Sequence, residues 1–172
     1  MSLARFSRAA ATPGYLYELA HGVIEVTHIP GLPHGVCVRR ISRAFAVYEE
    51  RNPDIVIFAG GGAEAKIELW GSHTERHPDF SVYLSAPPED TDQPWDRWTP
   101  DIVIEVVSAS SQKRDDGQKR ADYLAAGVRE YWIIDPLRRV GVFLTRRGDS
   151  WIETTIGPRG KWRTTPAPRL YT

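Results

Sequence analysis

Residues 100–136 read PDIVIEVVSASSQKRDDGQKRADYLAAGVREYWIIDP, and this stretch decides the fold. It opens with the β-branched run Ile102–Val107, whose apolar residues lie on both faces, as is typical of a strand inside a sheet. Asp115–Ala126 then shows a helical pattern before Gly127, and Tyr131–Ile134 predicts a second buried strand. A strand, a helix and a strand within about thirty residues predict a βαβ unit with two parallel strands and a right-handed crossover.

Glu105 places a carboxylate in the middle of the first of these strands. By the strand period of two, it shares a face with Asp101 and Val103. An ionised carboxylate in such a strand is unfavourable unless a cation pairs with it, and a metal ion or a lysine would be such a cation. The following helix offers Lys119, four residues before Tyr123 and therefore on the same helix face.

The rest of the chain predicts an antiparallel meander before the crossover and a hairpin after it. Strands are expected at 23–29, 55–58, 65–70 and 79–84, a helix at 34–51, and hairpin strands at 140–145 and 151–155. Gly60-Gly61-Gly62 lacks the spacing and the lysine of a phosphate-binding loop and predicts a turn. The Pro-rich segment 87–99 predicts a surface loop, whose Trp95 and Trp98 could stack on bases, contact a second copy or cover the core. We expect a mixed α/β sheet flanked by helices.

Composition limits the class of protein. The 172 residues suit a single domain, with a core at about 15–145 and a C-terminal hairpin and tail at about 146–172. A formal net charge of zero argues against an unstructured basic nucleic-acid binder. The single cysteine, Cys37, excludes an intrachain disulfide and a multi-cysteine zinc site, and we interpret it as a small apolar helix residue.

Targeting and charge patterns point to a cytoplasmic protein with no membrane partner. No apolar run approaches the ~20 residues that a membrane span needs, and the N-terminal residues lack the apolar core of a signal peptide. DNA contact has local support from basic pairs, although scattered surface charge is the alternative interpretation. These pairs lie at 113–114, 119–120, 138–139 and 146–147.

Asp79 is the second candidate carboxylate. It follows Pro78 at the start of a predicted strand, and this pair alone is common in turns. Together with Glu105 it supplies the hard oxygen ligands that suit Mg²⁺ or Mn²⁺. Such an ion lowers the pKa of bound water and neutralises charge on a phosphodiester. Lys119 could then orient the attacking water or stabilise the phosphate charge, unless it is a solvated lysine on an exposed helix.

The chain resembles the bacterial "putative restriction endonuclease" family, formerly a domain of unknown function, of the PD-(D/E)XK nuclease superfamily. The resemblance extends from Tyr15 to about Val142 and includes the helix that opens at His34. The matching stretches are YELAHGVIEV, HPDFSVYL, PDIVIEVVSASS, DDGQKRADYLAAGV and REYWIIDP. It implies a restriction-endonuclease-like fold and a Mg²⁺-dependent endonuclease that hydrolyses phosphodiester bonds of DNA. Segment 87–99 is longer than the usual link of that family, and SASS replaces a Ser-Pro-Ser-like turn.

The resemblance also implies roles for individual residues. The metal ligands would be Asp79 and Glu105. The superfamily places a lysine two residues after the acid, where this chain has Val107, so the resemblance selects Lys119 on the next helix.

Several further positions are weaker candidates for the site. A backbone carbonyl near Val106 is expected as a further metal ligand. An acid from the N-terminal part of the chain is expected to complete the site, and the candidates are Glu25 or else Glu18. His34 also matches a family position, with helix capping or a core role as the alternatives, and Tyr123 shares the helix face of the lysine.

Two other functions remain open on the sequence alone. A catalytically inactive DNA-binding or protein-interaction module would keep the fold, with Glu105 paired to Lys119 and no room for an ion. A hydrolase of another small phosphorylated substrate would have a closed pocket rather than an open groove. Because restriction-type cleavage of both strands usually needs two sites, a homodimer is expected for the endonuclease.

Overall fold

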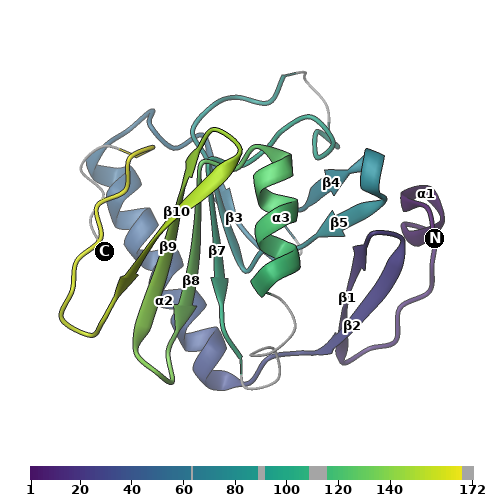
Figure 1. Ribbon diagram of the computed structural model, residues 1–172, viewed down its shortest axis with the longest axis horizontal. Helices are drawn as coiled ribbons and strands as arrows, with labels where there is room; N and C mark the ends of the chain where they lie inside the picture. Colours follow the sequence, from purple (N-terminus) through teal and green to yellow (C-terminus); the bar gives the residue numbers. More distant parts are fainter. Residues whose placement is uncertain (63, 89–91, 109–115, 168–172) are drawn as a thin grey trace.

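The computed structural model describes residues 1–62, 64–88, 92–108 and 116–167. The helices are α1 (Leu3–Phe6), α2 (Leu32–Arg51), η1 (Trp70–Ser72) and α3 (Asp116–Ala126). The strands are β1 (Tyr15–Ala20), β2 (Val23–His28), β3 (Phe58–Gly60), β4 (Ile67–Leu69), β5 (Thr74–Arg76), β6 (Phe80–Tyr83), β7 (Ile102–Val106), β8 (Glu130–Asp135), β9 (Val140–Arg147) and β10 (Ser150–Ile156). They form a six-stranded sheet in the order β10-β9-β8-β7-β6-β3 and a four-stranded sheet in the order β2-β1-β5-β4 (Figure 1).

The six-stranded sheet contains the predicted crossover. β7 pairs in parallel with β8, and α3 connects them, whereas the other neighbours in this sheet pair antiparallel. β7 lies between β6 and β8, as its apolar sequence predicts for an interior strand. The mixed sheet and its parallel pair are therefore confirmed, while the hand of the crossover stays a prediction.

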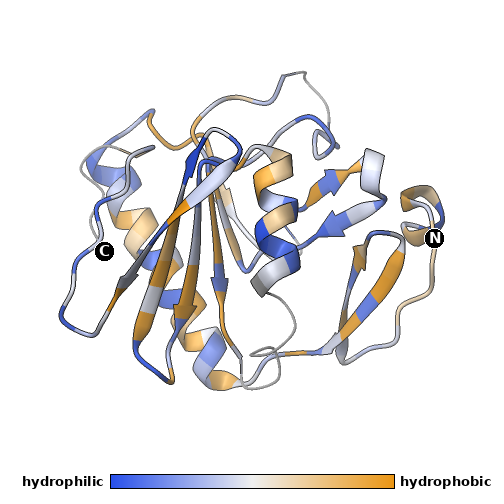
Figure 2. Cartoon of the chain, in the orientation of Figure 1, coloured by the Kyte–Doolittle hydropathy of each residue, from blue (hydrophilic) through white to orange (hydrophobic). Residues whose placement is uncertain are grey.

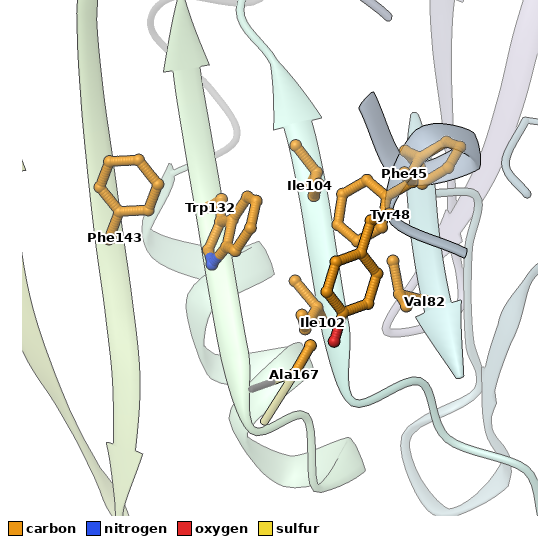
Figure 3. Packing of buried hydrophobic residues seen from close by; sticks show 9 residues of the cluster. Phe45, Tyr48, Val82, Ile102, Ile104, Trp132, Phe143 and Ala167 are labelled. Carbon is orange, nitrogen blue, oxygen red and sulfur yellow. The ribbon is translucent and has the colours of Figure 1, made fainter. Parts of the chain in front are cut away.

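The two long helices cover opposite faces of this sheet (Figure 1). On one face, Phe45 of α2 packs with Ile102, Ile104 and Trp132 in a buried aromatic and aliphatic cluster (Figure 3). On the other face, Val103 packs with side chains of α3, β8 and β9. Because side chains alternate along a strand, Glu105 points to the same face as Val103, beneath α3. The burial of each large apolar side chain stabilises this frame by about 1.5–3 kcal/mol.

The β1–β2 hairpin forms one edge of the smaller sheet. Leu16, Val23 and Val26 are exposed on it, and the hairpin stands out as an apolar ribbon in Figure 2. The register places Glu18 of β1 directly opposite Glu25 of β2, so both carboxylates lie on one face of the hairpin. The pairing between β1 and β5 consists of a single residue pair, and this pair joins the hairpin to the other strands of the smaller sheet.

Some predicted boundaries were wrong. The strand predicted at Ile55–Phe58 begins only at Phe58, because Asp54 adopts a left-handed conformation that prolongs the turn after α2. β5 was not predicted, since its sequence Thr-Glu-Arg lacks apolar alternation, although all three residues are buried.

The described residues of segment 87–99 form a loop with exposed positions such as Asp96 and Arg97, but Trp98 within it belongs to the core. Trp98 is only 8% exposed and packs against Tyr83 with ring centroids 4.1 Å apart. Its indole Nε1 donates a hydrogen bond to the Ser85 carbonyl. Of the roles considered for this residue, the structure supports covering the core. None of the helices in the described part of the chain combines the length and apolar character needed to cross a membrane.

Candidate active site

The strand register brings the two candidate metal ligands together. Phe80 of β6 lies opposite Ile104 of β7 in an antiparallel pair. Continuing this register by one residue places Asp79 opposite Glu105. Directly opposite residues of an antiparallel pair point to the same face, with Cβ atoms about 5 Å apart. Two carboxylates far apart in sequence therefore meet beneath α3.

Asp79 is held by one of its carboxylate oxygens. Its Oδ2 accepts a hydrogen bond from the Val106 N–H at 2.7 Å and lies 2.9 Å from His34 Nε2. This hydrogen bond to Asp79 raises the pKa of His34 above its ordinary value, despite the opposing effect of burial. The N-cap of α2 is Gly31, so His34 does not cap the helix but contacts a candidate metal ligand.

Glu105 is also held through a single oxygen. Its Oε1 accepts hydrogen bonds from Lys119 Nζ at 3.0 Å and from the Tyr123 hydroxyl at 2.5 Å. Among the described residues, no hydrogen bond reaches Glu105 Oε2 or Asp79 Oδ1. Burial raises the pKa of Glu105 to about 7; Lys119 opposes this shift, and the nearby carboxylate of Asp79 adds to it.

Lys119 lies between two carboxylates. It is only 7% exposed, and its Nζ is 3.0 Å from Glu105 Oε1 and 3.3 Å from Glu18 Oε2. Glu18 is fixed in turn, because its Oε1 accepts a hydrogen bond from the His77 N–H at 2.8 Å. Burial alone would raise the pKa of Glu18, but Lys119 and Arg76 lower it below its ordinary value. Lys119 is thus not a solvated lysine, and its ammonium points back at the strand acid.

Glu25 belongs to the same cluster but contacts a different cation. Its Oε2 accepts a hydrogen bond from Arg76 Nη1 at 2.5 Å, and the same Nη1 lies 3.2 Å from Glu18 Oε2. Of the two N-terminal acids, Glu18 is the one that contacts Lys119. Sequence reasoning did not find Arg76, because the polar triplet around it resembles a loop. The alternation of Thr74 and Arg76 on one face of a strand is the faint signal that could have revealed it.

The glycine run lies against Asp79. Gly62 N–H donates a hydrogen bond to the Pro78 carbonyl at 2.9 Å. A Cβ added at Gly61 would lie 2.2 Å from the Asp79 carbonyl oxygen, so no larger residue fits there without moving the backbone. Gly60 ends β3 and the chain leaves the sheet after it, as expected of a turn. The glycines therefore allow a close approach of two backbones beside Asp79.

A cavity of about 540 Å³ adjoins these residues. The β1–β2 hairpin forms one wall of it, with Tyr15, Tyr17 and His28 among the lining residues. Residues of the acidic cluster line the other side: Glu18, Glu25, Asp79, Glu105 and Lys119. The carboxylates are thus accessible to a ligand although each is largely buried.

The donor set suits a magnesium ion better than a structural transition metal. No group of three or more His, Cys, Asp and Glu side chains that could hold a metal occurs among the described residues. Closed zinc sites need four such ligands. Mg²⁺ is instead held by one or two carboxylates, with water and substrate phosphate completing its shell. Asp79 and Glu105, each with one oxygen free of hydrogen bonds among the described residues, fit that requirement.

Part of the basic surface expected to contact DNA is used within the protein. Arg120 Nη1 lies 2.6 Å from Glu153 Oε2, and Arg146 Nη1 donates a hydrogen bond to the Leu124 carbonyl. The pair at 113–114 lies outside the described residues. Among the described members of these basic pairs, Arg138, Arg139 and Arg147 are exposed and could contact phosphate.

Comparisons with known proteins agree with the fold. A family model described as "Putative restriction endonuclease" matches residues 3–168. Among solved structures, the chain is similar to "a putative nuclease belonging to DUF820 from Anabaena variabilis", with a TM-score of 0.79 and 17% sequence identity. That similarity covers 100% of this chain and 94% of the other, and it supports the fold alone. None of the curated proteins matches the sequence significantly.

Proposed function

We propose that this chain, which belongs to the "Putative restriction endonuclease" family, is a Mg²⁺-dependent endonuclease that acts on DNA. The observation that carries the proposal is the convergence of separate elements on Glu105. Asp79, directly before β6, lies opposite it when the β6–β7 register is continued by one residue, and Lys119 and Tyr123 of α3 both hydrogen-bond to it. A buried acid that keeps one oxygen open to a cavity is suited to binding a cation.

The two strand acids are proposed to hold the metal. Asp79 and Glu105 would bind Mg²⁺ or Mn²⁺ through the oxygens that carry no hydrogen bond, and the Val106 carbonyl is proposed as a further ligand. When bound, the ion supplies Lewis acidity, lowering the pKa of water and neutralising phosphate charge. His34 contacts Oδ2 of Asp79, and Oδ1 is the oxygen that is proposed to bind the ion. Such support of a ligand by its neighbours sets its orientation and its affinity.

Lys119 is proposed as the catalytic cation. Its ammonium contacts both Glu105 and Glu18. A charged donor held in place beside a phosphate stabilises the negative charge that develops in the transition state. Tyr123 holds the carboxylate of Glu105 from the same helix face. Of the two N-terminal acids, Glu18 rather than Glu25 is proposed to complete the site, because it touches Lys119.

An inactive module remains a second candidate function. It is favoured by the direct contact between Lys119 Nζ and Glu105 Oε1, which already neutralises the strand acid. It is also favoured by the lack of a three-ligand cluster in the described residues. This function predicts no affinity for Mg²⁺ or Mn²⁺, and calorimetry with either ion therefore separates the two candidates.

The main test is cleavage of supercoiled plasmid and of single-stranded DNA in the presence of Mg²⁺ or Mn²⁺. Glu105→Gln and Lys119→Ala should each lower the rate by about 100-fold or more. Glu153→Gln, which alters only the Arg120 contact on the exposed side of the molecule, is the matched control and should keep the wild-type rate. Equal rates in all four proteins would overturn the site. Turnover of p-nitrophenyl phosphate without DNA cleavage would favour a hydrolase of small phosphorylated substrates.

Cleavage of both DNA strands would require two such sites, so we propose a homodimer as the active form. Sedimentation of the protein with and without a short duplex measures this directly.

A further inference from the structure

We infer that Arg76 is the positioning residue that sets Lys119 against Glu105, an inference that rests on the proposed function. Arg76 lies in β5, in the smaller sheet, and only 1% of its surface is exposed. Its guanidinium therefore acts on substrate only through other residues. A buried guanidinium is unfavourable unless carboxylates surround it, and Arg76 contacts three of them.

The first connection from Arg76 to Lys119 passes through Glu18. Arg76 Nη1 lies 3.2 Å from Glu18 Oε2, and Lys119 Nζ lies 3.3 Å from that same oxygen. One carboxylate oxygen is thus shared by the guanidinium and the ammonium. Any movement of Glu18 toward or away from Arg76 changes the contact that holds Lys119 from one side.

The second connection passes through α3 itself. Arg76 Nε and Nη2 both lie 2.9 Å from Asp122 Oδ2. Asp122 is three residues after Lys119, so the two side chains are neighbours on the helix surface. Asp122 is almost fully buried and also contacts His21 Nε2 at 3.0 Å. Arg76 therefore anchors the same helix turn that carries the proposed catalytic lysine.

Together these contacts give the site a defined charge balance. Without Arg76, Glu18 and Asp122 would each lose a buried cationic partner. Lys119, which already contacts Glu18 and stands one helical turn from Asp122, would be drawn toward them and away from Glu105. The effect requires the planar, forked guanidinium, because Arg76 holds Asp122 with Nε and Nη2 while its Nη1 contacts Glu18, and a lysine has no such fork.

The test compares Arg76→Met and Arg76→Lys with the control Arg146→Met. Arg146 also ties down α3, but it donates to the Leu124 carbonyl near the C-terminal end of the helix and lies outside the acidic cluster. The measurements are kcat and KM for DNA cleavage, and the Mg²⁺ dissociation constant from calorimetry. Arg76→Met should lower kcat about 10-fold or more while KM and the Mg²⁺ constant change less than about 2-fold, because Asp79 keeps its contacts with His34 and Val106, and Tyr123 still holds Glu105. Arg146→Met should leave kcat near the wild-type value.

A rescue variant separates positioning from a general structural role. Arg76→Met combined with Asp122→Asn removes one of the acids that would attract Lys119, so kcat should recover at least about 3-fold over Arg76→Met alone. If Arg76→Met does not fold, Arg76→Lys and its combination with Asp122→Asn are measured in the same way. An unchanged kcat in folded Arg76 variants, or a loss that the second change does not relieve, overturns the inference and leaves the proposed nuclease intact. A wild-type protein that binds Mg²⁺ but cleaves no DNA overturns both.

Discussion

Two buried glutamates on neighbouring parallel strands, Glu105 of β7 and Glu130 of β8, are bound in opposite ways. Glu130 is fully buried, and both of its oxygens are saturated by neutral donors. Its Oε1 accepts from the Thr165 N–H and hydroxyl, and its Oε2 accepts from Trp132 Nε1, Trp162 Nε1 and the Thr164 hydroxyl. Glu105 has a cationic and a neutral donor, both on one oxygen.

This difference separates an acid whose hydrogen bonds hold the fold together from one that retains an oxygen for a ligand. Because five donors surround Glu130, the carboxylate holds residues 162–165 against the sheet and has no capacity left for a ligand. Glu105 keeps one oxygen free among the described residues, faces a cavity and has a pKa raised to about 7 by burial. Burial of a carboxylate alone therefore does not indicate a site, whereas incomplete saturation beside a cavity does.

The largest predicted contrast is in stability. Glu130→Gln places an amide NH₂ against groups that now donate hydrogen bonds to the carboxylate, so it should lower the free energy of unfolding by about 2–4 kcal/mol. Glu105→Gln should change it by less than about 1 kcal/mol, because Lys119 retains Glu18 as a partner. Urea denaturation of both variants, followed by far-UV circular dichroism, measures the difference.

Activity should show the reverse order. Per folded molecule, Glu130→Gln keeps wild-type DNA cleavage, while Glu105→Gln loses it. A Glu130→Gln protein that is as stable as wild type would remove the structural half of the comparison.

The next prediction concerns how the stabilisation by Mg²⁺ depends on pH. The pKa of Glu105 is raised to about 7 without metal, so a bound ion must displace a proton below that pH. The rise in unfolding free energy that 10 mM Mg²⁺ gives should therefore be about 1 kcal/mol larger at pH 8 than at pH 6. The metal-free protein should show the opposite trend, since a folded-state pKa above the unfolded value contributes stability at low pH that is lost as pH rises toward 7.

Glu105→Gln supplies the control for this measurement. With no proton to displace, its metal response should be small and nearly independent of pH, whereas Glu130→Gln should retain the wild-type step. A Mg²⁺ stabilisation that is equal at both pH values in the wild type contradicts the assignment of Glu105 as a ligand.

The sequence singled out Glu105 but not Glu130, for a physical reason. Glu105 is conspicuous because β-branched residues surround it, and the helical repeat of Lys119 and Tyr123 points at the same face. Glu130 begins its strand, where a charged residue is ordinarily solvated, and most of its partners come from the C-terminal tail thirty or more residues later. Contacts of that range leave no local pattern in the sequence.

The same limit applies to Asp79 and Arg76. Asp79 was predicted from its Pro-Asp pair and the family resemblance, but only the β6–β7 register shows that it lies opposite Glu105. Arg76 lies in a strand of three polar residues, and its three acidic partners come from β1, β2 and α3. Its burial depends on the assembled sheet, and no hydrophobic periodicity reports it.

The smallest expected effects come from substitutions that remove one neutral hydrogen-bond donor to each glutamate. Tyr123→Phe deletes a hydrogen bond that lowers the pKa of Glu105, so that pKa should rise further. The acidic limb of the pH–rate profile for DNA cleavage should then move to higher pH, while the rate at pH 8.5 changes little. Thr164→Val deletes one of the donors to Glu130 and should lower stability by about 1 kcal/mol without moving the profile.

The two substitutions are matched because each removes one hydroxyl that donates a hydrogen bond to a glutamate. They differ in the other contacts of that glutamate. If the proton on Glu105 controls metal binding, a change of one hydrogen bond must appear in the pH axis of the Tyr123→Phe profile. A loss of rate that is the same at every pH would instead mean that Tyr123 shapes the pocket and leaves the charge of Glu105 alone. A shifted pH–rate profile in Thr164→Val would show that the two glutamates are coupled through the β7–β8 pair. That result would contradict the view that Glu130 acts only in stability.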